Sequence, residues 1–463
     1  MNKLAANPVS LELIEDIHGK TLDLLNRYGI YFEDPIALDF LLTHGAVKGG
    51  EGRVCFPSRL VEETLKLAPE SFFVTARNPE KSFGVGGDYP QAYGPGAGMT
   101  TILESQGRRP ATLADAHAFL KLAHTSPYCS VSAAGLLYPP ELPPLKALHI
   151  QLFAALTLSD KPLFGLTQDE NYAADSIAMA RIASGINSAS AEKICMGVVN
   201  SLSPLGWAGN MLRALRVFAM ENQPLVIAAC AMSGATSPVS LAGTLVTSNA
   251  EILAGIVYSQ LLSPGTPVIY GNTSGIADMA TMALSIGAPE CTLLAAGSAA
   301  LARYYHIPCR TGGGLSDSPF MDMQAGAESM LNMLGTVNCG AAFILQCFGV
   351  MESFLSLSYE KWLFDEEILD KALRFQKGIS PPGSSLVDEI IDAINDESGF
   401  LGHETTVKGF KDEFLFPILS ARGSAEKHEL LAAAGRLCEK RLALYTAPFL
   451  PADIEAALKK YTE

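Results

Sequence analysis

The residues that could do chemistry in this chain follow short apolar runs, and most of them are neutral. No histidine or lysine takes such a position, the carboxylates do not cluster, and no HxH or HxxE spacing suggests a metal site. Zinc, Schiff-base and proton-abstraction chemistry are therefore weakly supported. The set suits a site that holds a small charged molecule without acid–base work. The candidates are Tyr93, Asn200, Tyr270, Asn272, Arg310, Gly312, Gly313, Gln346, Phe348 and Glu352.

Several of these residues also have a purely structural interpretation. Tyr93 and Tyr270 could pack at a barrel rim, and Arg310 could form an ion pair with Glu352 or Asp317. The three glycines at 312–314 are explained first by backbone geometry, because glycine adopts conformations that other residues avoid. Asn200 is a stronger functional candidate, because a polar side chain just past a buried strand needs partners.

The elements that must position these residues alternate along the chain from Gln91 onward. Short apolar runs bounded by turn signals are separated by longer helical stretches, which predicts parallel strands joined by crossover helices. Eight such units predict a TIM (β/α)8 barrel, whose site lies at the carboxyl ends of its strands. The eight runs are Gln91–Gly94, Cys129–Ala133, Pro162–Leu166, Ile194–Val199, Leu225–Ala229, Pro267–Tyr270, Ile307–Thr311 and Ala342–Cys347.

The sequence predicts three regions. A helical cap with a small hairpin covers residues 1–90, the barrel covers residues 91–355, and a helical extension packed on the barrel covers residues 356–463. Expected cap elements are helices at Leu11–Tyr28, Pro35–His44 and Pro57–Leu67 and a hairpin of Phe72–Ala76 with Lys81–Val85. Expected barrel helices include Leu113–Ala123, Leu145–Leu158, Asn171–Ile182, Asn210–Glu221, Pro289–Tyr305 and Met321–Leu334. The extension predicts helices at Asp365–Lys377, Leu386–Asn395 and His428–Leu444, with Gly399–His403 as a turn back to the barrel.

Composition narrows the function classes. The formal net charge is -15 and no Lys/Arg cluster interrupts it, so a nucleic-acid partner is not expected. Nine cysteines without a CxxC pair predict reduced thiols and a cytoplasmic location. Met1–Ser10 shows no signal peptide, and Leu241–Leu262 carries polar residues that predict a buried helix rather than a membrane span.

Stretches across nearly the whole chain resemble the trimethylamine methyltransferase family, whose members pass a methyl group from a methylamine to the cobalt corrinoid of a separate protein. The matching segments are Phe32–Pro35, Arg77–Pro79, Ala229–Leu241, Asn249–Gly255, Pro264–Tyr270, Leu301–Asp317, Met351–Lys361, Phe400–His403 and Phe410–Phe416. Trimethylamine-specific members carry a pyrrolysine, and this sequence has none. The chain therefore resembles the branch that demethylates quaternary amines such as glycine betaine, proline betaine or carnitine.

The resemblance implies a nucleophile from outside the chain, the Co(I) corrinoid (cobalamin) of a partner protein, and no metal bound tightly here. It also implies roles for the candidates. Arg310 and the backbone N–H groups of 312–314 would hold a carboxylate, and Tyr93, Tyr270 and Phe348 a cation. Asn200, Asn272 and Gln346 would orient the remainder, although many relatives appear to have a histidine where this chain has Gln346.

Two other functions stay open at this point. Whether the chain forms a homo-oligomer stays open as well. A barrel enzyme acting on a phosphorylated metabolite would use the glycines after the seventh strand. A betaine-binding protein without activity would bind tightly and transfer nothing.

Overall fold

The computed structural model describes residues 9–143, 146–187, 190–423 and 429–463. Leu145 and His428, where two helices were expected to begin, lie outside the described residues, as do residues 1–8. The centre is a sheet of eight parallel strands in the order β6-β19-β18-β15-β13-β11-β10-β9. Each strand overlaps one predicted run, which confirms all eight. They are β6 (Ala92–Tyr93), β9 (Ser132–Ala133), β10 (Leu163–Phe164), β11 (Cys195–Asn200), β13 (Leu225–Ala229), β15 (Val268–Asn272), β18 (Cys309–Gly312) and β19 (Phe343–Leu345).

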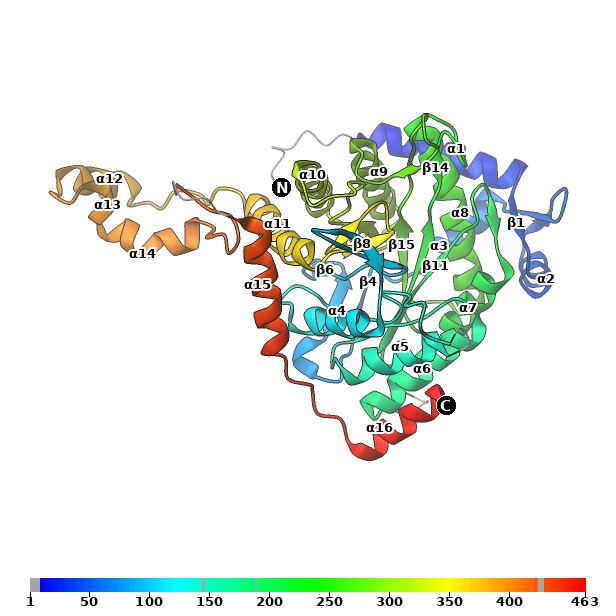
Figure 1. Cartoon of the computed structure of the whole chain (residues 1–463). Helices are drawn as coiled ribbons and strands as arrows, with labels where there is room; N and C mark the ends of the chain where they lie inside the picture. The colour runs from blue at the N-terminus through cyan, green and yellow to red at the C-terminus, as the bar shows by residue number, and fades with distance from the viewer. Residues whose placement is uncertain (1–8, 144–145, 188–189, 424–428) are drawn as a thin grey trace.

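The first and last strands of this order close the ring. A parallel bridge joins Tyr93 to Cys129, just before β9, and the Ser130 N–H donates to the Tyr93 carbonyl at 2.7 Å. Every residue of β13 and β15 is buried, as expected for strands that face the barrel interior on one side and helices on the other. The fold is the predicted TIM-type barrel (Figure 1).

The predicted helices are confirmed, with end shifts of a few residues. Those around the barrel are α4 (Leu113–Thr125), α5 (Ala147–Thr157), α6 (Glu170–Ser184), α7 (Gly209–Met220), α8 (Leu241–Leu262), α9 (Pro289–Tyr304), α10 (Met323–Cys339) and α11 (Tyr359–Lys377). By length and composition α8 is long and apolar enough to cross a membrane, but 78% of its apolar window is buried inside the fold. It is a core helix.

The amino-terminal region holds α1 (Leu11–Arg27), α2 (Pro35–Thr43), α3 (Ser58–Leu65) and the predicted hairpin of β4 (Ser71–Val74) and β5 (Phe83–Gly86). Small sheets also link this region and the carboxyl-terminal extension to barrel loops. The sheet members are β1 (Ile30–Phe32), β2 (Val47–Lys48), β3 (Arg53–Cys55) and β12 (Gly206–Trp207) in one, β7 (Thr101–Glu104), β8 (Gly107–Pro110), β20 (Val350–Met351) and β21 (Ser356–Leu357) in another, and β14 (Met232–Ser233), β16 (Gly275–Ala277) and β17 (Leu284–Ser285) in a third. The domain boundaries at 90/91 and 355/356 stay predictions, since two of these sheets cross them.

Beyond α11 the chain forms an arm that projects from the barrel (Figure 1). The arm consists of α12 (Leu386–Asn395), α13 (Gly399–Gly402) and α14 (Glu404–Glu413). The expectation that Gly399–His403 turns back to the barrel is wrong, because this segment is a short helix within the arm. The chain returns at Leu419 and Ser420, whose N–H groups donate to Glu367 of α11 at 2.5 and 3.1 Å. It continues with α15 (Leu430–Ala443), which packs on α11, and with α16 (Ala452–Lys459) beside α6.

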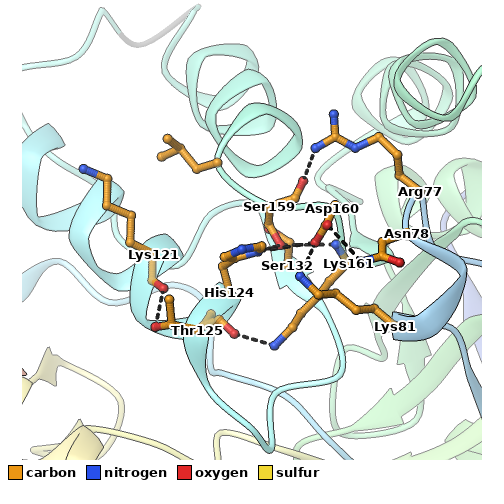
Figure 2. Close-up of polar contacts among 12 residues, drawn as sticks. Arg77, Asn78, Lys81, Lys121, His124, Thr125, Ser132, Ser159, Asp160 and Lys161 are labelled. Carbon is orange, nitrogen blue, oxygen red and sulfur yellow. Dashed lines mark hydrogen bonds and ion pairs between the residues drawn. The ribbon is translucent and has the colours of Figure 1, made fainter. Parts of the chain in front are cut away.

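A cluster of charged side chains ties the β4–β5 hairpin to the barrel (Figure 2). Asp160 accepts from Lys81 at 2.5 Å and lies 3.4 Å from His124, while Lys161 donates to the Ala123 and Ser126 carbonyls at 2.7 and 3.0 Å. Burial lowers the pKa of Lys161 to about 8. Burial and the charge of Lys81 lower the pKa of His124 to about 4, against the opposing pull of Asp160.

His124 therefore makes the fold sensitive to acid. Between pH 6.5 and pH 4 the unfolded chain binds a proton at this histidine and the folded chain does not, so the free energy of unfolding falls as pH falls. In urea titrations, the free energy of unfolding of the parent chain should fall between pH 7 and pH 4.5 by about 2 kcal/mol more than that of His124→Asn. The exposed His44→Asn is the matched control. Equal slopes for His124→Asn and the parent chain would contradict the prediction.

Candidate active site

A cavity of about 410 Å³ lies at the carboxyl end of the barrel, within the range typical of small-molecule sites. Strands or following loops from all around the ring contribute to it, as expected for the mouth of a barrel. The lining residues are Pro95, Ala97, Gly98, Tyr138, Phe164, Thr167, Gln168, Val198, Asn200, Met211, Cys230, Thr273, Arg310, Leu345, Gln346 and Phe354. Three of the predicted site residues are brought together here: Asn200, Arg310 and Gln346.

Arg310 is a buried cation on β18. Its side chain is 2% exposed, its Nη2 donates to Gln346 Oε1, and its Nε has no hydrogen-bond partner. Among the described residues no Asp or Glu pairs with it; Glu352 pairs instead with Arg108 at 3.2 Å, and Asp317 accepts from the Ile286 and Gly287 N–H groups. Burial lowers the pKa of Arg310 to about 10. The structure thus rejects the predicted structural ion pair.

The loop that follows β19 has an unusual backbone. Gln346 and Phe354, which both line the cavity, have φ angles of 51° and 75°. Non-glycine residues pay about 1–3 kcal/mol for such conformations, which persist where the surrounding structure enforces them. With these backbone conformations both side chains line the cavity, and Gln346 accepts a hydrogen bond from Arg310.

Three aromatic side chains line the cavity, and sequence reasoning missed them all. Phe164 lies on β10, which is four places from β18 in the ring and therefore faces Arg310 across the barrel. Tyr138 is oriented by the amide of Gln168, which donates to its hydroxyl at 2.9 Å. Phe354 comes from the strained loop. Together they present π-faces that can hold a cation.

The aromatic residues predicted for this role point elsewhere. The Tyr93 hydroxyl donates to Gln91 at 3.4 Å. The Tyr270 hydroxyl donates to Asn249 of α8 at 3.0 Å. Phe348 is fully buried, with its ring 5.4 Å from that of Trp362. None of the three lines the cavity, so the prediction that they face it is wrong.

Four further candidates also lie outside it. Asn272 donates to Ser298 of α9 at 2.6 Å. Gly313 packs so closely that an added Cβ would lie 2.9 Å from the Cys347 sulfur, and its N–H donates to the Leu345 carbonyl at 2.9 Å. Gly312 borders a separate void of about 20 Å³. Glu352 pairs with Arg108 at 3.2 Å. None of these four residues lines the cavity, and their role in binding stays a prediction.

A larger groove of about 940 Å³ lies outside the barrel, between α10, α11 and α15. Most of its residues come from helices rather than from the carboxyl ends of strands, where the active sites of barrel enzymes lie. Among the described residues no group of three His, Cys, Asp or Glu side chains could hold a metal ion. The mouth cavity is therefore the candidate active site.

The comparisons agree with this fold. A family model described as "Trimethylamine methyltransferase (MTTB)" matches residues 2–463. "Glycine betaine methyltransferase" of Desulfitobacterium hafniense (strain Y51) is 38% identical, over 98% of this chain and 96% of that protein. "Proline betaine:corrinoid methyltransferase" of Eubacterium limosum is 31% identical, over 98% and 96%. The solved monomethylamine methyltransferase (MtmB) of Methanosarcina barkeri is similar in fold, with a TM-score of 0.53 at 10% identity, covering 95% of this chain and 89% of that one.

These matches define a barrel of the methylamine methyltransferase type. The chain belongs to the trimethylamine methyltransferase family.

Proposed function

We propose that this protein moves a methyl group from a carboxylated quaternary amine, such as glycine betaine, proline betaine or carnitine, to the corrinoid of a partner protein. The observation that carries the proposal is Arg310, a buried cation that lines the same cavity as three aromatic side chains and has no carboxylate partner among the described residues. The names of the relatives, which act on betaines, support the substrate class.

A betaine fits the two sides of the cavity. Its carboxylate would take the Nε and Nη groups of Arg310, satisfying the buried donor that has no partner. Its ammonium would lie toward Phe164, Tyr138 and Phe354 on the opposite side. Aromatic faces contribute about 0.5–2 kcal/mol to cation binding. Much stronger binding of the cation by aromatic side chains would stabilise the substrate more than the transition state, because the nitrogen loses its charge as the methyl group leaves.

The chemistry asks for no proton transfer by this chain. When the N–CH₃ bond breaks, its electron pair stays on nitrogen and the amine leaves neutral. The lining residues include no Asp, Glu, Lys or His, which fits a reaction without a general acid. A Co(I) corrinoid supplies the nucleophile when the partner presents it. The chain's own residues hold the substrate in line and keep water away.

A phosphorylated substrate is less well supported. Its phosphate would need free backbone N–H groups at 312–314, but the Gly313 N–H is used in the β18–β19 ladder and none of these glycines lines the cavity.

The test mixes the full chain with Co(I) cobalamin and a panel of glycine betaine, proline betaine, carnitine and trimethylamine. We expect at least one betaine to yield methylcobalamin, followed by absorbance, and trimethylamine to be inert. If trimethylamine alone reacts, the substrate class is wrong. Tight betaine binding without methylcobalamin would indicate a binding protein.

A further inference from the structure

A second buried charge lies behind the mouth, on α8. Glu251 is 0% exposed. Its carboxylate accepts hydrogen bonds from the Ser201 and Ser203 hydroxyls, the latter at 2.7 Å, and from the Leu205 N–H at 2.8 Å. Burial raises the pKa of Glu251, and these three donors oppose the rise. Three convergent donors are the environment of an ionised carboxylate.

No cation neutralises this carboxylate within the described part of the chain. Its partners are two hydroxyls and one N–H, and no Lys, Arg or His forms an ion pair with it. Burying an unpaired charge is costly, and apolar packing or an amide could replace a merely structural one. The field of Glu251 must therefore extend into its low-dielectric surroundings.

Those surroundings include one side of the cavity. Ser201 directly follows Asn200, a lining residue at the end of β11. Cys230 is the lining residue after β13, and the loss of solvent around its sulfur raises the pKa of its thiol, while the hydrogen bond with Thr273 lowers it. Smaller effects come from both charges: Arg310 lowers this pKa and Glu251 raises it. In the ring, β11 lies three places from β18. The cavity thus lies between an anion on the β11 side and the Arg310 cation on β18.

We propose that Glu251 is a specificity-determining residue whose negative charge draws the quaternary ammonium toward the Asn200 side, opposite Arg310, and so fixes the direction in which a zwitterion enters. This rests on the proposed function. Glu251 does not touch the substrate and acts through the field behind Asn200 and Cys230. The same carboxylate also holds the turn from Ser201 to Leu205, so the test must separate charge from loop support.

Two ligands of the same shape make the separation. Glycine betaine carries a trimethylammonium group, and 3,3-dimethylbutanoate has carbon in place of that nitrogen, with the same carboxylate. In calorimetric titrations of the full chain, we expect Glu251→Gln to weaken glycine betaine binding about threefold, because the lost attraction to the ammonium exceeds the lost repulsion of the more distant carboxylate. Binding of 3,3-dimethylbutanoate should instead become tighter, because its carboxylate loses the repulsion of Glu251 and the ligand carries no cation to offset that change.

Control variants isolate the loop. Ser203→Ala removes one contact to the turn but no charge, and should affect both ligands equally. Glu251→Asp keeps the charge, so the ratio of the two affinities should stay that of the parent chain even if both affinities weaken. This variant provides the test if Glu251→Gln does not fold. Equal losses in Glu251→Gln, or a changed ratio in Glu251→Asp, would overturn the inference. A parent chain that binds glycine betaine and transfers its methyl group keeps the proposed function intact in either case.

Discussion

Arg310→Met should abolish most betaine demethylation and, at the same time, make the ligand-free protein more stable. Truncating one partner of a buried charge pair costs about 2–5 kcal/mol, so kcat/KM for the preferred betaine should fall about 30-fold to 5000-fold. A choline-like substrate has no carboxylate for Arg310 and should lose far less. Without ligand, however, the guanidinium is a buried donor with an unsatisfied Nε, so its replacement by an apolar side chain should raise the free energy of unfolding by about 1–3 kcal/mol.

Arg310→Met is expected to lower activity but raise stability, and these opposite effects distinguish a binding role of Arg310 from a structural one. Arg181 offers a matched control, since it is an arginine with little exposure that pairs with Glu221 at 2.7 Å, away from the cavity. Arg181→Met should leave kcat/KM within about threefold and lower stability slightly. Equal losses for betaine and choline-like substrates, or a less stable Arg310→Met, would remove Arg310 from the proposed carboxylate site.

Lys361→Met should destabilise the fold by about 3–5 kcal/mol, the cost of leaving a buried charge unpaired. Lys361 and Asp365 are 1% and 0% exposed and lie 2.7 Å apart. Lys361 also donates to the Gly314 carbonyl at 2.8 Å, and Asp365 accepts from the Gly349 N–H at 2.8 Å. Burial lowers the pKa of Lys361 and raises that of Asp365, so each side chain keeps its charge because of the other.

This pair connects two loops near the cavity. One follows β18, the strand that carries Arg310, and the other follows β19 and carries Gln346. Urea unfolding of Lys361→Met, Asp365→Asn and the double variant gives the coupling energy: the double variant should lose clearly less than the two single losses added. The exposed pair of Lys408 and Glu404 has the same spacing on α14, and Lys408→Met should cost less than about 0.5 kcal/mol. Additive losses at 361 and 365 would mean that the two side chains are not energetically coupled.

The strands could be predicted because each is a buried apolar run between turn signals. The direction in which their side chains point could not. Tyr93 and Tyr270 follow from the same pattern as Arg310, yet residues on both sides of a barrel strand are buried, so the alternation that reveals an inner face is missing. Phe164 was hidden inside a predicted strand for the same reason.

The loops limited the prediction further. Phe354 and Gln346 depend on positive φ angles at non-glycine residues, which no local propensity announces. Glu251 belongs to α8, far from any strand end in the sequence, and only the folded chain brings it behind Asn200. Asn200, Arg310 and Gln346 could be found because each is a polar residue near or just past the carboxyl end of a strand, which needs no knowledge of side-chain direction.

The arm of α12–α14 has a consequence for how the molecule opens. Of its helical residues only Ala393 is buried, while Val387, Ile394 and Leu401 are 67%, 64% and 86% exposed. Helices of this length gain little stability by themselves. Their amide protons should therefore exchange with solvent through local opening, at a small fraction of the free energy that protects the amides of β13 and β15.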